Sequence, residues 1–314
     1  MGRYPEVDLE RLHLLPVAER LTRVRVEDFG EVGPPAEAAA LVDRLPHQLG
    51  GLALRQVRDA IVTAHRGGRP VVLLAGAHVV KVGVSPYLTA WMNKGVVSHL
   101  ALHGAGALHD LEIARFGSTS EDVEENLHRG VFGLVEETGR HFYEAVVAGQ
   151  QAGEGLGEAL GRRLVEADAP HREVSLLAVA YERRIPATVH VALGTDTVHA
   201  HPGGDDAALG ATSMRDFRIL AHTLLEARGA VVLNLGSAVI LPEVFIKALT
   251  VAVHLGASLD GLTTVNLDQI QHYRPRVNVL ERPTRGAGGR AIALTGHHEI
   301  LVPLLAGAVL HELA

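Results

Sequence analysis

The stretch Ala187-Thr188-Val189-His190-Val191-Ala192-Leu193 decides the fold, because of its own pattern and because of the loop that follows it. Its β-branched and apolar side chains predict a buried strand of a parallel sheet. The loop, residues 194–210, is dense in carboxylates, imidazoles and glycines, and a helix is expected to begin near Thr212. In open α/β sheets, ligands bind at the carboxyl ends of strands. This strand-to-helix loop is therefore the first candidate for part of an active site.

The same alternation of apolar runs and helix-like segments extends along most of the chain. Further strands are expected at residues 71–75, 96–102, 230–235, 261–267 and 291–295. Helices are expected at residues 51–66, 85–93, 121–129, 133–148, 156–167, 174–184, 214–227, 242–255 and 300–313. This order predicts a doubly wound, mostly parallel Rossmann-like α/β sheet in a single domain, residues 51–314. Residues 1–50 are charged and interrupted by proline, and are expected to form an N-terminal arm with short helices.

Composition limits the class of protein and of chemistry. The 314 residues are 47% hydrophobic, which suffices for a large core, and the net charge of −7 argues against a nucleic-acid partner. The sequence has no apolar run of about 18 residues and no signal-like start, so we expect no membrane partner and a cytoplasmic location. The absence of cysteine excludes thiol catalysis and thiolate zinc sites. Only three lysines occur, so a lysine nucleophile has three possible positions: Lys81, Lys94 and Lys247.

Four expected strand ends carry small or polar residues, at 76–78, 103–110, 194–206 and 234–237. Glycine lets the backbone approach a phosphate closely at a helix N-terminus. The loops at 103–110 and 234–237 fit this need, although neither is a G-x-G-x-x-G followed by an acidic residue. Glycines at such places can equally serve to pack a strand closely against a helix.

Histidines and carboxylates near these strand ends are candidates for acid–base chemistry, because their pKa values can be tuned toward neutrality. The catalytic candidates are Asp196, His201, His109, Glu243 and His298. No metal is expected, since no H-E-x-x-H or comparable spacing occurs. An alternative is a metal held by His199, His201 and Asp205, because alternate residues of an extended segment share one face. Glu243 can also simply complement a helix dipole, and each histidine can bind a carbonyl or carboxylate.

The order of motifs over residues 70–312 resembles the deoxyhypusine synthase family. Leu74-Ala75-Gly76-Ala77-His78, followed by Val84-Ser85-Pro86-Tyr87, is similar to that family's first strand and helix. Residues 103–111 resemble its T-A-G-G-V-E-E-D-L loop, and residues 185–196 resemble its I-P-V-F-S-P-A-L-T-D-G segment. Residues 230–239 are similar to its strand and G-G-G-V nucleotide loop, and residues 303–308 to its terminal P-L-L-V-A helix.

This resemblance implies an NAD-binding Rossmann-like domain and a homotetramer with active sites between subunits. The family oxidises spermidine and transfers an aminobutyl group to a lysine, so an NAD-dependent transferase or oxidoreductase is implied. The resemblance assigns NAD binding to Gly76, His103, Gly104, Gly106, Asp110, Thr195, Asp196, Gly236 and Ser237.

The chain departs from the family where the family's chemistry takes place. The family's W-G-K segment, which carries the catalytic lysine, corresponds to residues 278–284, which contain no lysine. Its G-G-G-V-V-K-H-H run corresponds to residues 236–243 without the histidine, and its D-G-S-D run to residues 271–274. An imine on a lysine needs a lysine in the cleft. We therefore expect an NAD-dependent enzyme acting on a small polar substrate, such as an amine or polyamine, but not an authentic deoxyhypusine synthase. The alternatives are a metal-dependent hydrolase or lyase using His199, His201, Asp205 and His298, and a non-catalytic ligand-binding oligomer.

Overall fold

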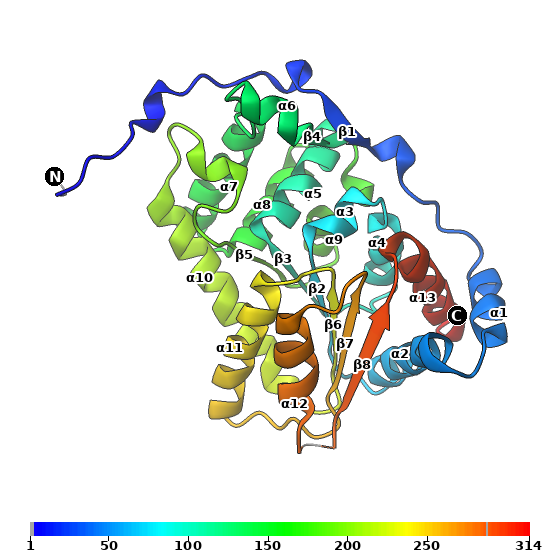
Figure 1. The fold of residues 1–314 in the computed structure, drawn as a ribbon. Helices are drawn as coiled ribbons and strands as arrows, with labels where there is room; N and C mark the ends of the chain where they lie inside the picture. Colours follow the sequence, from blue (N-terminus) through cyan, green and yellow to red (C-terminus); the bar gives the residue numbers. More distant parts are fainter. Residues whose placement is uncertain (1–2, 287) are drawn as a thin grey trace.

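The computed structural model describes residues 3–286 and 288–314. In this part of the chain six parallel strands form one sheet, in the lateral order β5-β3-β2-β6-β7-β8 (Figure 1). Their bounds are β2 Val71–Ala75, β3 His99–His103, β5 Ala187–His190, β6 Val231–Leu235, β7 Thr263–Asp268 and β8 Arg290–Thr295. Numbered within the sheet, this order is 3-2-1-4-5-6, which is the strand order of the Rossmann fold. The expected doubly wound parallel α/β sheet is confirmed.

Helices connect the strands and cover both faces of the sheet. The longer ones are α1 Pro35–Arg44, α2 Leu49–Arg66, α4 Ser85–Asn93, α5 Gly104–Phe116, α7 Glu136–Ala152, α8 Leu156–Glu166, α10 Asp206–Thr223, α11 Ile240–His254 and α13 His298–Glu312. The shorter ones are α3 Ala77–Lys81, α6 Val123–His128, α9 Leu176–Glu182 and α12 Arg282–Thr284, with a π-helical segment η7 over Pro275–Glu281. None of the helices described is both long enough and apolar enough to cross a membrane.

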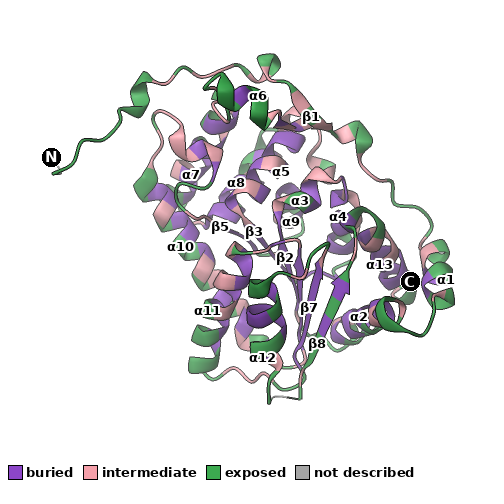
Figure 2. Cartoon of the chain, in the orientation of Figure 1, coloured by how far each residue is buried: buried purple, intermediate pink, exposed green. Residues whose placement is uncertain are grey.

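Alternation along the strands divides the interior into two cores. Val71 and Leu73 of β2 face a core that also takes side chains from α2, α5, α8, α9 and α13. Val72 and Leu74 face the opposite side, where α10, α11 and η7 pack. Successive strand residues point to opposite faces, so a strand between two helical layers must be apolar throughout. All five residues of β2 are fully buried, as the central position of this strand requires. Figure 2 shows that the edge strand β8, by contrast, is partly exposed.

The N-terminal arm lies against its own chain. Strand β1, Thr22–Arg25, pairs with the antiparallel strand β4, Ser118–Glu121, and α1 packs beside α13. Figure 1 shows the arm passing α6 and β4 on the side of the molecule toward which the sheet's strands point. The arm therefore covers the carboxyl ends of the strands, where ligands bind in this fold.

Several expected boundaries were wrong, for local reasons. The helix expected from residue 214 begins at Asp206, because the side chain of Asp205 accepts a hydrogen bond from the Ala208 N–H and caps it. The pairing of β1 with β4 was not predicted, since antiparallel partners distant in sequence leave no local pattern. The segment expected as a helix from residue 121 begins with the last residue of β4, and α6 starts only at Val123.

Two glycines allow β2 and β6 to meet at the point where the strand order reverses. A Cβ added at Gly76 would lie 2.4 Å from the Gly236 carbonyl oxygen, and the Gly76 N–H donates to the Leu235 carbonyl at 2.8 Å. The obstructing atoms, in the Gly236 carbonyl group and the Ser237 N–H, belong to the backbone, so they cannot move aside as a side chain can. Close approach of the two strand ends thus requires glycine at this position.

We predict that Gly76→Ala lowers the free energy of unfolding by about 1–3 kcal/mol, because the added methyl group overpacks a rigid backbone crossing. The matched control is Gly50→Ala in α2, where an added Cβ meets nothing within 4 Å. Alanine there should be neutral or stabilise by up to about 1 kcal/mol through its helix propensity. Urea unfolding measures both variants, and equal stability of Gly76→Ala and the unmodified chain would contradict the close crossing.

Candidate active site

A pocket with titratable and charged walls lies at the carboxyl ends of β2, β3 and β5. It has a volume of 200 Å³, and we call it the acid–base pocket. Its charged and titratable lining residues are Arg20, Lys81, His109, Glu112, Glu121 and Asp196. Its apolar wall includes Leu108, Val123 and Phe132. The position agrees with the general placement of ligands in open α/β sheets.

Five separate segments bring these side chains together. Lys81 is the last residue of α3, which follows β2, and His109 and Glu112 lie on α5, which follows β3. Asp196 lies in the loop after β5, and Arg20 comes from the arm just before β1. The opposite wall is β4, in which Ser120 has a φ of +63°. A left-handed backbone at a residue with a side chain is strained, and such strain is concentrated at functional sites.

The carboxylate of Glu112 accepts hydrogen bonds from three side chains around this pocket. One of its carboxylate oxygens accepts from Arg20 Nη1 at 2.5 Å and from Thr138 Oγ1 at 2.7 Å, and the other accepts from Thr119 Oγ1. The side chains of Arg20 and Glu112 are only 4% and 5% exposed. A buried carboxylate is costly unless it is paired and hydrogen-bonded. The three donors meet that requirement and fix the position of the carboxylate.

The same network fixes the proton position on His109. His109 Nδ1 lies 2.7 Å from Thr119 Oγ1, whose own hydrogen is donated to Glu112. The threonine oxygen therefore accepts, and Nδ1 of His109 donates. This leaves the lone pair on Nε2, since a neutral imidazole carries one proton. Burial lowers the pKa of His109 to about 4, and the charges of Lys81 and Arg20 add to the effect while Glu112 opposes it.

Asp196 occupies the N-terminus of α5. Its carboxylate lies against Gly104 at the first turn of this helix, and burial raises the pKa of the carboxyl. A Cβ at Gly104 would lie 1.8 Å from Asp196 Oδ2, so glycine is needed there to admit the carboxylate. Helix N-termini attract negative groups, and here the chain supplies one itself. Thr195, which precedes Asp196, also lines the pocket.

The other turns predicted to bind NAD are used by the protein itself. The Ala77 N–H after Gly76 donates to Nε2 of His103 at 3.1 Å, and the ring of His298 lies 3.0 Å from where a Cβ of Gly236 would be. Ser237 Oγ accepts from the Leu241 N–H at the start of α11. Gly106 has only ordinary contacts, the nearest at 3.7 Å. In this conformation the Ala77 amide, Ser237 Oγ and the space beside Gly236 thus already have partners within the chain.

Asp110, assigned to the cofactor by the resemblance, instead caps α9. Its carboxylate accepts from Ser175 Oγ at 2.6 Å and from the N–H groups of Leu176 and Leu177 at 2.7 and 3.0 Å. The carboxyl is fully buried, and burial raises its pKa to about 6. All of these contacts are to a helix N-terminus, so the structure gives Asp110 a structural position.

Three of the catalytic candidates lie away from the acid–base pocket. His201 packs against Gly139 and beside Tyr143, where it lines a separate open pocket of 650 Å³. Glu243 pairs with Lys247 and with Arg274, on the first turn of α11. His298 is fully buried, with Nε2 3.1 Å from the Leu267 carbonyl oxygen. Only His109 and Asp196 of the five candidates share the acid–base pocket.

The alternative metal ligands do not converge. His199 Nδ1 accepts from the N–H groups of Gly194 and Asp196, whereas Asp205 caps α10. His201 lines its own pocket, and His298 is buried against the Leu267 carbonyl. Within residues 3–286 and 288–314, no three histidine or acidic side chains form a group that could hold a metal ion.

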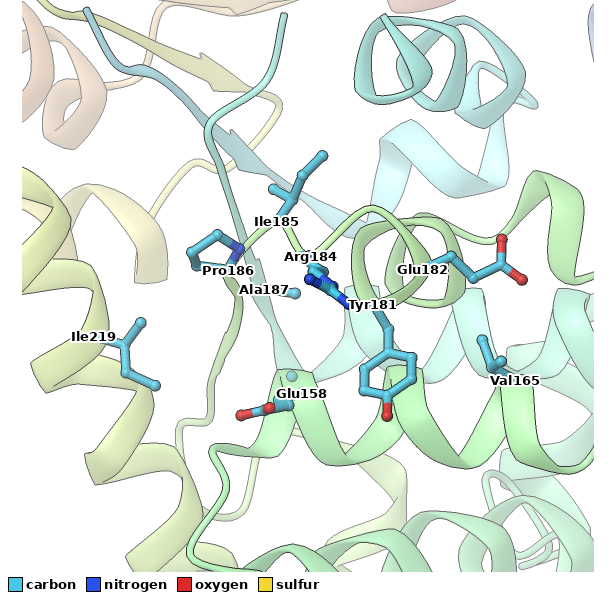
Figure 3. A pocket seen from close by; sticks show the side chains of 10 residues that line it. Glu158, Val165, Tyr181, Glu182, Arg184, Ile185, Pro186, Ala187 and Ile219 are labelled. Atoms are coloured by element: carbon cyan, nitrogen blue, oxygen red, sulfur yellow. The ribbon is translucent and has the colours of Figure 1, made fainter. Parts of the chain in front are cut away.

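A larger pocket lies at the opposite end of the sheet. It has a volume of 700 Å³ and surrounds the segment 184–187, which leads into the amino end of β5. Figure 3 shows Ile219 from α10 on one side of this segment and Glu158 and Val165 from α8 on the other. Because ligands in this fold bind at the carboxyl ends of strands, volume alone does not make this pocket the active site.

Sequence reasoning missed Arg20, Glu112 and Thr119. Arg20 and Glu112 are 92 residues apart along the chain, and nothing local predicts their pairing. Lys81 had a signal, since it is one of three lysines, but its position beside His109 depends on how α3 packs on α5. The folding of the chain, rather than any local pattern, brings these residues into one pocket.

Comparison with known proteins shows the fold and no more. No family model matches the chain, and no curated protein matches its sequence. One similar solved structure is that of ArgZ, an arginine dihydrolase of the ornithine–ammonia cycle in cyanobacteria. It is 16% identical, with a TM-score of 0.53. The match covers 83% of this chain but only 33% of ArgZ. A conserved LOR/SDH protein from Methanococcus maripaludis S2 is 14% identical with a TM-score of 0.51, over 98% of this chain and 75% of that one.

A deoxyhypusine synthase-like protein from Entamoeba histolytica is also similar. It is 11% identical with a TM-score of 0.49, over 82% of this chain and 87% of that one. This value is too low to support an argument about descent. The resemblance to the deoxyhypusine synthase family therefore stays a prediction, while the Rossmann-like fold is established.

We predict that His109 stays neutral, with its proton on Nδ1, throughout the neutral pH range and titrates near pH 4, because burial disfavours the imidazolium ion. Nitrogen chemical shifts of the imidazole ring report both the tautomer and the pKa, and His109→Gln identifies the signal. A titration near the ordinary histidine value of about 6.5, or a proton on Nε2, would contradict the hydrogen-bonded network around Glu112.

Proposed function

We propose that the chain is an enzyme that acts on a small amine-bearing polar substrate in the acid–base pocket. The observation that carries the proposal is the chain of contacts from Glu112 through Thr119 to His109. It leaves Nε2 of a pocket-lining histidine free to accept a proton. A base that is oriented by a second group, which is itself held by a third, is the general arrangement of acid–base catalysis.

In this proposal His109 accepts a proton from the substrate at Nε2, and Glu112 stabilises the resulting imidazolium ion through Thr119. The pKa of His109 is about 4 in the free pocket, which makes it a weak base there. Part of that lowering comes from the positive charges of Lys81 and Arg20. A negatively charged group of the substrate beside these two cations would raise the pKa toward the working pH, where general bases are most effective.

A nicotinamide dinucleotide is the cofactor that we propose, on the basis of the Rossmann strand order and the sequence resemblance. When bound, it would supply hydride transfer. In this conformation the chain's own groups occupy the space beside Gly76, Gly104 and Gly236, so binding there would require Asp196 to leave the first turn of α5. The role proposed for His109 does not depend on the cofactor.

The homotetramer with sites between subunits is likewise proposed from the resemblance alone.

The test is turnover of a panel of small amines and amino acids, with and without NAD, followed by mass spectrometry. We expect at least one substrate, NAD-dependent turnover, and a loss of about 10²–10⁴-fold in His109→Gln. The matched control is His254→Gln at the end of α11, which should retain activity.

Three results would count against parts of the proposal. Turnover that is unchanged in His109→Gln would contradict the catalytic role of this histidine. Turnover without NAD would contradict the proposal that NAD is the cofactor, but not the proposal that catalysis takes place in the acid–base pocket. Binding without any turnover would favour the non-catalytic ligand-binding alternative.

A further inference from the structure

The acid–base pocket holds unpartnered groups of both charges. Arg20 uses Nη1 on Glu112, but its Nε and Nη2 are buried and have no hydrogen-bond partner within the described residues. Lys81 also lines the pocket, and its ammonium group forms no hydrogen bond or ion pair with any residue described. Buried donors are costly to leave unpaired, so donors without a partner in the chain are expected to bind a ligand or water.

The free edge of Arg20 has a specific shape. Nε and Nη2 lie side by side on the guanidinium group and donate two parallel hydrogen bonds. This arrangement matches the two oxygens of a carboxylate, which is why arginine is favoured for bidentate recognition. The side chain is 4% exposed and is held by its pair with Glu112, so the edge is fixed in place.

An unpartnered acceptor lies in the same pocket. Asp196 Oδ2 is buried and has no hydrogen-bond partner within the described residues, and the side chain is 4% exposed. Nε2 of His199 lies 3.8 Å from this oxygen, too far for a hydrogen bond. A positively charged donor on the ligand would satisfy this oxygen.

We propose that the acid–base pocket binds a small zwitterion of the α-amino acid class, with its carboxylate on the free edge of Arg20 and beside Lys81, and its ammonium group facing Asp196. This inference rests on the proposed function of the same pocket and names its substrate class. A simple anion would leave Asp196 unsatisfied, and a diamine would place a second cation against Arg20 and Lys81. The volume of 200 Å³ equals that of about seven liquid water molecules, which suits a ligand of this size.

The arm has a direct part in this recognition. Arg20 lies just before β1, and the pairing of Thr22 with Glu121 fixes the arm beside the pocket. A carboxylate-bearing ligand would therefore bind only while the arm is docked. Its binding should stabilise that docking in turn, because a ligand stabilises the state to which it binds.

The experiment is thermal-shift screening of the twenty protein amino acids at millimolar concentration, followed by titration calorimetry. Each amino acid that stabilises the protein is compared with the amine that differs from it only in lacking the carboxylate. The key variant is Arg20→Lys, which keeps the charge opposite Glu112 but removes the two-pronged edge. Arg23→Lys is the matched control, because Arg23 lies in the same arm and pairs with Asp122 at the surface.

We expect at least one amino acid to bind, its amine counterpart to bind at least about tenfold more weakly, and Arg20→Lys to weaken amino-acid binding by about tenfold or more. Arg23→Lys should bind as the unmodified chain does. Circular dichroism shows whether Arg20→Lys is folded, and Lys81→Gln provides a second variant at a less buried position.

Equal binding of an amino acid and its amine, or unchanged binding in both Arg20→Lys and Lys81→Gln, would overturn the proposal. If only amines bind, the substrate class is wrong while the proposed function stands. If neither amino acids nor amines bind, the proposed function falls with it.

Discussion

The buried carboxylate of Glu112 is the contact on which the candidate site depends. It joins the arm through Arg20, β4 through Thr119 and α7 through Thr138. His109 is oriented from the same network, through its contact with Thr119. Removing one partner of such a buried pair leaves an uncompensated charge, which costs about 3–5 kcal/mol. The position of the arm, the proton on His109 and the free edge of Arg20 therefore all follow from the hydrogen bonds of one buried side chain.

The glycines at the strand ends have a different use from the one that a nucleotide site would give them. Gly76 allows β2 and β6 to meet, and Gly104 admits the carboxylate of Asp196 onto α5. A helix N-terminus that already holds a carboxylate repels a phosphate and can attract a cation beside it. The candidate site therefore lies in the pocket over β3 and β5, and not at the centre of the sheet where β2 and β6 meet.

The fold could be predicted from sequence because buried parallel strands are continuous apolar runs. Residues 71–75 and 231–235 are such runs, each with predicted helices on both sides, and both are strands in the structure. The candidate site could be predicted only in part. His109 and Asp196 follow strand ends, and the structure places both in one pocket. Arg20 and Glu112 could not be paired from sequence, because the contact joins distant segments whose local patterns carry no sign of it. His298 and His201 resemble site residues in sequence, but tertiary packing places them elsewhere.

The most direct measurement is a double-mutant cycle between Arg20 and Glu112. Arg20→Gln, Glu112→Gln and the double variant are compared with the unmodified chain by urea unfolding. If Glu112 holds the arm through this pair, the two substitutions should be strongly non-additive, with a coupling of about 1–3 kcal/mol. Additivity within about 0.5 kcal/mol would show that the arm and the pocket are independent, and would contradict the central role of the Glu112 carboxylate.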